Sequence, residues 1–244
     1  MARLSDISAE IKAEARGALL GKLGISVGAN LLTMLIALVL TEISLSVFSG
    51  SSAVDLIGSE AVSFLIALFV GILLYGLFYI YMSLLYGQPV VFSDLFRGFR
   101  RESSDRIIRV QAVLSAINIL SMLPAMILIQ ITPQGQLHTR ALLLAVFCII
   151  GFGVEIYFEL TFSMSYFILI DFPEMSAADV LRTGRNMMAG RKGRLLYISL
   201  SFLPLYLLGL LSFGIANLWV SAYHAAALAA FYRREAAQPS SAAR

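Results

Sequence analysis

Residues 191–234 read RKGRLLYISLSFLPLYLLGLLSFGIANLWVSAYHAAALAAFYRR, and this stretch decides how the chain is organised. Between Arg194 and Arg233 lie 38 residues without a Lys, Arg, Asp or Glu. One straight helix of that length would measure about 57 Å, nearly twice a hydrocarbon core of about 30 Å. It would also put its two flanking arginines on opposite sides of a membrane. We therefore expect the chain to fold back at residues 212–214 and to form two short spans.

The rest of the chain repeats this alternation of basic clusters and apolar runs. All but one of its 18 Lys and Arg residues fall in four clusters, at residues 3–22, 97–109, 182–194 and 233–244, and the exception is Arg140. Basic residues stay on the cytoplasmic side of a bilayer, so the clusters predict that both ends of the chain lie inside. The sequence thus predicts an all-α polytopic membrane protein with six transmembrane helices, amphipathic cytoplasmic interfacial helices and an N-in/C-in orientation.

The composition agrees with a membrane protein. Hydrophobic residues make up 59% of the chain and charged residues 14%, against about 45–50% and about 25% in soluble domains. The 244 residues suit about six spans and leave no room for a separate soluble catalytic domain. The net charge of +3 is explained by the orientation signal. We therefore expect a protein that is not an enzyme, has no cofactor and does not bind nucleic acid.

The expected organisation has three parts: a cytoplasmic amphipathic segment at 1–21, a six-span bundle at 22–232 and a cytoplasmic basic tail at 233–244. Hydrophobic periodicity predicts surface helices at 4–16 and 176–189. The six spans are expected at about 22–44, 61–86, 107–131, 141–170, 195–212 and 215–232.

A serine and an acid stand before each expected hairpin, which suggests three parallel units of surface helix plus hairpin. The alternative is that helix N-caps and basic loops recur in any membrane protein. The three pairs are Ser5 and Asp6, Ser93 and Asp94, and Ser176 and Asp179.

Four glycines, at positions 17, 21, 24 and 28, follow a spacing of four, three and four residues at the start of the first span. Small residues at this spacing let helices approach closely. We expect an internal packing seam, and the alternative is a face for self-association.

Three stretches carry a resemblance to a known family. The first, within residues 11–24, has the pattern Ile-Lys-x-x-Ala-Arg-x-x-Leu-x-Gly-x-x-Gly, and the second, at 92–99, reads FSDLFRGF. The third is a C-terminal block whose matching positions are Tyr166, Phe167, Asp171, Pro173, Met188, Gly190, Leu200, Ser201, Phe202, Gly214, Ile215, Leu218, Trp219, Tyr223, Phe231 and Tyr232. On these residues the chain resembles, over its whole length, the bacterial integral membrane proteins of domain of unknown function 975.

The resemblance implies a multi-pass protein of the bacterial cytoplasmic (inner) membrane, and it implies no activity. The chain departs from the family pattern at Ala222, where the family often has a proline, and within 203–206, where it tends to carry a tryptophan. These departures concern only the packing of the last hairpin.

Two acids in the middle of the fourth span are the strongest candidates for chemistry. Glu155 and Glu159 are four residues apart and share one helix face. Because an ionised acid at bilayer depth costs about 3 kcal/mol, each should face the bundle interior or water. Depth counting puts Asn118 and His224 within about 5 Å of the level of Glu159. This cluster can bind a cation or relay protons, while the simpler interpretation is a polar clamp between helices.

The second candidate site is basic. We expect the side chains of this site to bind anionic lipid headgroups or a protein partner at the cytoplasmic face. They are Arg182, Arg185, Arg191, Lys192 and Arg194.

The sequence predicts no catalytic residues and no metal site. His138 and His224 are expected on opposite sides of the membrane, and no Cys/His spacing fits zinc. The favoured hypothesis is a non-enzymatic membrane scaffold or regulator that uses its basic cytoplasmic helices. The alternative is a small permease or channel with a polar path at Glu155 and Glu159.

Overall fold

A computed structural model describes residues 4–48, 53–131 and 137–237 of the chain. Within these ranges every regular element is helical, which confirms the predicted all-α fold. In chain order the elements are α1 (Leu4–Leu19), α2 (Leu23–Val47), α3 (Ala53–Leu85), the 3₁₀ helix η1 (Phe92–Phe99), α4 (Arg101–Ile131), α5 (Leu137–Phe162), α6 (Ser165–Asp171), α7 (Ala177–Met188), α8 (Lys192–Leu200), α9 (Leu203–Leu210) and α10 (Asn217–Ala236).

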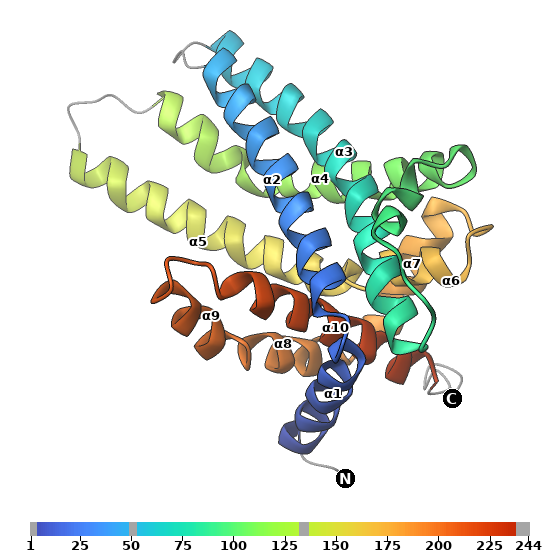
Figure 1. The fold of residues 1–244 in the computed structure, drawn as a ribbon. Coiled ribbons are helices and arrows are strands. Elements are labelled where there is room, and N and C mark those ends of the chain that lie inside the picture. Colours follow the sequence, from blue (N-terminus) through green and yellow to red (C-terminus); the bar gives the residue numbers. More distant parts are fainter. Residues whose placement is uncertain (1–3, 49–52, 132–136, 238–244) are drawn as a thin grey trace.

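The elements follow one another as three units of short helix plus hairpin. Helix α1 precedes the α2–α3 hairpin, η1 precedes α4 and α5, and α7 precedes the hairpin made by α8, α9 and α10. The hairpins fan out from a common base, where α1, α6, α7 and the end of α10 gather (Figure 1). This order of elements is the one that the three serine–acid pairs suggested.

Five segments of the described chain are long and apolar enough to cross a membrane, so a multi-pass membrane protein is supported. The helix α10 is not among them, because its second half carries charges, including Arg233, Arg234 and Glu235. The five segments are Leu23–Val47, Ile57–Leu85, Ser104–Ala125, Ala141–Asp171 and Lys192–Leu210.

The last apolar stretch folds back where the sequence suggested. The helix α9 ends at Leu210 and α10 begins at Asn217. Between them Phe213 (φ 52°) and Gly214 (φ 84°) adopt left-handed backbone conformations that reverse the chain. The first arm of this hairpin, which α8 and α9 form, is itself broken after Leu200. The Nζ of Lys12 donates a hydrogen bond of 3.0 Å to the carbonyl of Ser201 at this break.

Three boundaries differ from the expected ones. The fourth apolar run is two helices, because the helix breaks between Phe162 and Ser165. The helix α10 continues past residue 232 to Ala236, so the start of the expected basic tail is helical and packed. The segment before α4, which was expected on the cytoplasmic side, is a 3₁₀ helix whose Asp94 carboxylate accepts a hydrogen bond of 3.0 Å from the backbone N–H of Val91.

The glycine seam expected at the first span is not formed. Gly21 adopts a positive φ of 74° and separates α1 from α2, so no single helix carries the four glycines. A Cβ atom added at Gly17, Gly21 or Gly24 would meet nothing within 4 Å, and only Gly28 approaches a side chain, that of Phe92. The spacing here reflects a helix junction instead of close helix packing.

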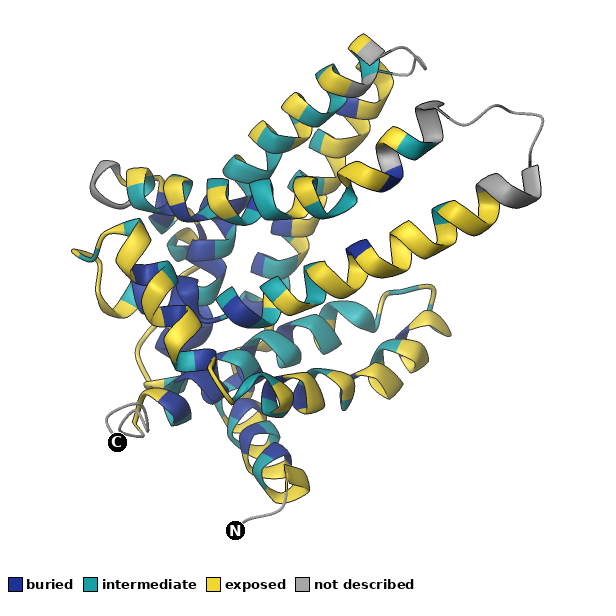
Figure 2. Cartoon of the chain, turned by 180° about the vertical axis from the view of Figure 1, so that it is seen from behind, coloured by how far each residue is buried: buried dark blue, intermediate teal, exposed yellow. Residues whose placement is uncertain are grey.

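Protein packing is concentrated at the base of the molecule. Figure 2 shows buried residues gathered there, while the arms of the hairpins carry mostly exposed and intermediate ones. Tyr81, Phe167 and Tyr232 are among the largest fully buried side chains. Exposed leucines and isoleucines along the arms, such as Leu45 and Ile149, are what a helix facing lipid requires.

Two glycines let η1 lie directly on α3. A Cβ atom at Gly76 of α3 would overlap the backbone carbonyl of Leu95, and one at Gly98 of η1 would overlap the carbonyl of Ile72. Leu95 is fully buried at this contact. The close approach therefore depends on the absence of side chains at both positions.

The base is held by a buried carboxylate near the end of α10. The side chain of Glu235 is 0% exposed and accepts two ion pairs, at 2.9 Å from Arg191 and 3.0 Å from Arg194. Arg191 also donates to the backbone carbonyl of Glu235. These contacts tie the end of α10 to the beginning of α8.

The three residues before Glu235 bind three other elements. The hydroxyl of Tyr232 donates a hydrogen bond of 2.6 Å to Asp171 at the end of α6. Arg233 pairs with Glu14 of α1 and donates to the carbonyl of Leu85 at 2.7 Å. Arg234 pairs with Glu10 of α1 at 2.6 Å. We call residues 232–235 the C-terminal tetrad. It joins α1, α3, α6 and α8.

We predict that Glu235→Ala lowers the free energy of unfolding in detergent micelles by about 3–5 kcal/mol, because it leaves two partly buried guanidinium groups without their carboxylate. The matched control is Glu174→Ala, which removes a carboxylate that is 91% exposed and pairs with Arg106. This control should cost less than about 1 kcal/mol. Equal losses in the two variants would contradict a structural role for the tetrad.

We also predict that Gly76→Ala destabilises the protein by about 1–3 kcal/mol, because η1 must move away from α3 to admit a methyl group. Gly153→Ala in α5 is the control, since a Cβ there meets nothing within 4 Å. Thermal unfolding followed by circular dichroism would compare the two. A Gly76→Ala protein as stable as the control would show that η1 does not pack as described.

Candidate functional site

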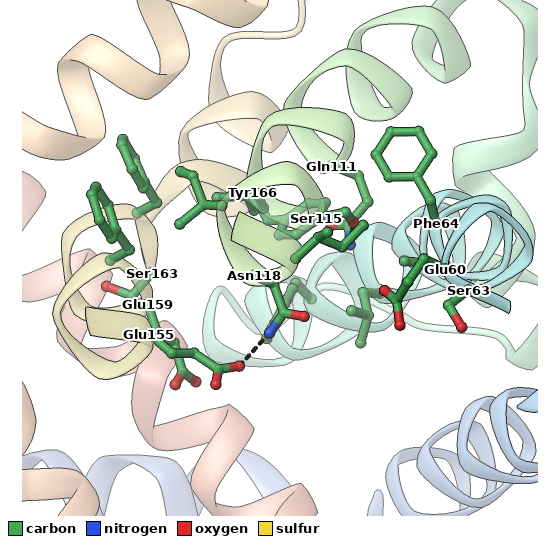
Figure 3. A pocket seen from close by; sticks show the side chains of 18 of the residues that line it. Glu60, Ser63, Phe64, Gln111, Ser115, Asn118, Glu155, Glu159, Ser163 and Tyr166 are labelled. Atoms are coloured by element: carbon green, nitrogen blue, oxygen red, sulfur yellow. Dashed lines mark hydrogen bonds between the residues drawn. The ribbon is translucent and has the colours of Figure 1, made fainter. Parts of the chain in front are cut away.

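A cavity of about 440 Å³ lies between α3, α4, α5, α6 and α10. Its wall is mainly apolar, with side chains such as Phe64, Phe78 and Phe158. Nine polar residues also line it, and three of them are glutamates (Figure 3). The polar residues are Glu60, Ser63, Gln111, Ser115, Asn118, Glu155, Glu159, Ser163 and Tyr166.

The glutamates come from two sides of the cavity. Glu155 and Glu159 follow each other by one turn on α5, and the amide Nδ2 of Asn118 on α4 donates to Oε1 of Glu155 at 2.5 Å. Glu60 reaches the same space from α3, beside Ser63 (Figure 3). No Lys, Arg or His is among the described residues that line this cavity, so its wall is acidic.

The inner end of the cavity is closed by a chain of hydrogen bonds. The buried hydroxyl of Tyr166 donates to Oε1 of Gln111 at 2.5 Å, and the Nε2 of Gln111 donates to the hydroxyl of Ser115 at 3.2 Å. Gly71 of α3 has no side chain at the point where the Gln111 side chain passes. Ser63 and Glu159 are exposed, whereas Ser115 and Tyr166 are buried. The cavity is therefore closed at Ser115 and Tyr166 and exposed at Ser63 and Glu159.

The structure brings together Glu155, Glu159 and Asn118, but not His224. The Nδ1 of His224 lies 3.2 Å from the hydroxyl of Tyr206, and its Nε2 lies 3.3 Å from the hydroxyl of Ser199. Its ring also stacks on Phe202, with 4.7 Å between the ring centroids. Depth counting placed His224 at a suitable level, but the residue faces the arm of its own hairpin.

Besides the serines at 63 and 163, sequence reasoning missed four further polar residues of the cavity. Three residues on α4, at positions 111, 115 and 118, are spaced four and three residues apart, which marks one helix face. That spacing was a usable signal. Glu60 was assigned to a loop, and Tyr166 was taken only as part of a family pattern, so neither gave a signal of its own. The missed residues are Glu60, Gln111, Ser115 and Tyr166.

The five basic residues of the second candidate site do not form one surface. Arg191 and Arg194 bind Glu235, and the Nζ of Lys192 lies 3.6 Å from the ring centroid of Tyr157. Arg182 and Arg185 remain exposed on α7, whose opposite face is buried through Val180, Gly184 and Met188. Three of the five side chains are thus engaged inside the protein.

Acidic groups do not assemble into a metal site in the part of the chain that the structure describes. No group of three or more His, Cys, Asp or Glu residues there could hold a metal ion.

Comparison with known proteins places the whole bundle in one family. The model of the family described as "Protein of unknown function (DUF975)" matches residues 6–238, from the start of α1 to beyond the C-terminal tetrad. The chain belongs to this family. No curated protein and no solved structure matches it. Since the description of the family gives no activity, the function of this DUF975 protein has to be argued from its geometry.

We predict that a cysteine at Asn118, an exposed cavity residue, in a Cys148→Ser background, reacts with a cationic methanethiosulfonate about tenfold faster than with an anionic one, a difference of about 1.4 kcal/mol. The Glu155 carboxylate, which accepts a hydrogen bond of 2.5 Å from the native Asn118, supplies this much even at an effective dielectric constant of about 20. Adding Glu155→Gln and Glu159→Gln should abolish the preference. Equal rates for the two reagents before that change, or no reaction with either, would contradict an accessible acidic cavity.

Proposed function

We propose that this protein is a small, non-enzymatic permease that takes a positively charged, partly apolar molecule into the cavity. The observation that supports the proposal most is the set of three cavity glutamates. None of Glu60, Glu155 and Glu159 forms an ion pair with a described residue. The wall around them is largely apolar. A cation with an apolar body fits both properties.

The cost of placing acids at bilayer depth favours this interpretation over a clamp. Each ionised acid costs about 3 kcal/mol in the middle of a membrane helix, so such residues usually have a partner or a functional role. The bond from Asn118 to Glu155 does tie α4 to α5 and is a clamp in that sense. Glu159 has no such bond to the described residues, so a clamp accounts for only one of the two acids in the middle of α5.

The scaffold hypothesis has less support from the geometry. It needs a free basic surface, but Arg191, Lys192 and Arg194 are engaged inside the protein. Arg182 and Arg185 are still suited to anionic lipid headgroups or an acidic protein partner, because they project from the exposed face of a helix that lies at the base. We keep this surface as a second candidate, for anchoring at the membrane.

For the orientation, we propose that the base faces the cytoplasm of a bacterial cell and that the protein lies in the cytoplasmic membrane. The basic clusters on α1, η1, α4 and α7, and the basic end of α10, support it. In this arrangement six apolar helical segments form three hairpins, and both ends of the chain are inside. The cavity then opens toward the outer side.

The test uses ethidium, a planar organic cation, with purified protein in liposomes. Wild-type protein should bind ethidium, as measured by fluorescence anisotropy, and should speed its entry into the vesicles. The double variant Glu155→Gln/Glu159→Gln should lose both properties, because the cation loses two opposite charges in a low-dielectric site. Entry would be followed by the fluorescence of ethidium on enclosed DNA.

The control is Glu42→Gln, which removes an exposed acid on α2 that is not among the residues lining the cavity. It should bind and transport like wild type. Ethidium binding without any transport would refute the permease hypothesis and would indicate a protein that only binds the cation. Ethidium binding that survives in the double variant would refute the role of the cavity glutamates.

A further inference from the structure

The end of the third hairpin differs from an ordinary outer loop in its composition. Residues 207–219 read LLGLLSFGIANLW and contain no charged residue. By contrast, the stretch that links the arms of the first hairpin is followed closely by Asp55 and Glu60, and the sequence around the second reversal contains His138 and Arg140. The chain thus offers no charged group that would hold the third reversal in water.

Apolar side chains at this reversal lie uncovered. Phe213 is 99% exposed and Leu211 is 81% exposed. No described part of the chain covers them. Five more large apolar residues around the reversal are also exposed, namely Leu207, Leu208, Leu210, Ile215 and Trp219.

The backbone of the reversal satisfies its own hydrogen bonds. Each N–H from residue 211 to residue 218 donates to an acceptor within the same turn. The hydroxyl of Ser212 supplies one of these acceptors, for the N–H of Ala216 at 2.9 Å, and itself donates to the carbonyl of Gly209. The side-chain oxygen of Asn217 fills the space left by the missing side chain of Gly209, where it is buried and has no hydrogen-bond partner among the described residues. The backbone N–H groups of the turn, by contrast, are all paired. In water these N–H groups could donate to solvent instead, but in hydrocarbon every unpaired N–H group costs free energy.

The conformation of Phe213 points to a contact outside the protein. Its φ of 52° lies in the left-handed region, which is unfavourable for a bulky residue. Strain of this kind persists only when something else compensates it. Within the described structure the side chain has almost no neighbours. Transfer of the aromatic ring of Phe213 from water into lipid would compensate this strain, and the described part of the protein offers no other burial for the ring.

The third hairpin is also the shortest of the three. Its arms, Lys192–Leu210 and α10, have 19 and 20 residues, whereas α3 has 33 and α4 has 31. At about 1.5 Å per residue the arm Lys192–Leu210 would measure about 28 Å if it were one unbroken helix. This length falls short of a hydrocarbon core of about 30 Å when the helix is tilted.

We infer that residues 207–219 form a re-entrant tip whose partner is the acyl chains of the leaflet farther from the base, and that this tip does not reach the water beyond. The chain returns from within the membrane to the base, so both ends stay on the same side. The inference does not depend on what the cavity binds.

The test measures the depth of a nitroxide label attached to Phe213→Cys in a Cys148→Ser background, reconstituted in phosphatidylcholine–phosphatidylglycerol vesicles. The matched control is Val54→Cys, at the far end of the first hairpin, where the native side chain is 77% exposed. Electron paramagnetic resonance compares the accessibility of each label to oxygen, which concentrates in hydrocarbon, and to a water-soluble nickel chelate.

We expect the label at 213 to be relaxed by oxygen and not by the nickel chelate, and the label at 54 to show the opposite. A second site, Leu211→Cys, guards against a local change of the turn at 213 and should behave in the same way. Relaxation of both tip labels by the nickel chelate to the extent seen at 54 would overturn the inference. So would modification of both tip cysteines by a membrane-impermeant maleimide.

Discussion

The base of this protein depends on the ion pairs of one buried carboxylate, that of Glu235. A carboxylate with no exposed surface requires opposite charge close by, and Arg191 and Arg194 supply it. Because Tyr232, Arg233 and Arg234 stand in the same helical turn, the position of Glu235 also fixes their contacts to α6, α3 and α1. Among the described residues the hairpin arms have no comparable network of ion pairs, and the cavity lies where the packed base gives way to diverging arms.

The architecture was readable from the sequence because membrane insertion depends on coarse, local properties. Uncharged runs predicted the long helices, although α3 begins at Ala53 and α4 at Arg101, before the expected starts at 61 and 107. The charge-free stretch after Arg194 predicted the fold-back. Breaks inside spans were not predicted. The break after Leu200 has a local cause in Pro204, which has no N–H to donate to the Leu200 carbonyl. A contact from another helix, the bond from Lys12 to the Ser201 carbonyl, is added at the same break. Such contacts leave no mark in local periodicity.

The candidate site was only partly readable. The cost of a mid-membrane charge singled out Glu155 and Glu159 without any knowledge of the fold, and depth along the helix brought in Asn118. Depth says nothing about rotation around the helix axis, and for that reason His224 was grouped with residues it does not face. The basic residues illustrate the same limit. A positive-inside signal in the sequence does not reveal that Arg191 and Arg194 bind Glu235, which lies 44 and 41 positions further along the chain.

The pairing of Arg234 with Glu10 has a consequence for biosynthesis. These two residues are separated by 224 positions, so the ribosome has made nearly the whole bundle before the first helix can find its partner. Until then Glu10 and Glu14 of α1 lack their arginine partners on α10, and the loop to be closed is about as long as the chain allows. Assembly of the base is therefore a late, post-insertion event. In a nascent chain that stops before the tetrad, the hairpins would be inserted but would lack the contacts of residues 232–235. Such a chain would be exposed to quality-control proteases.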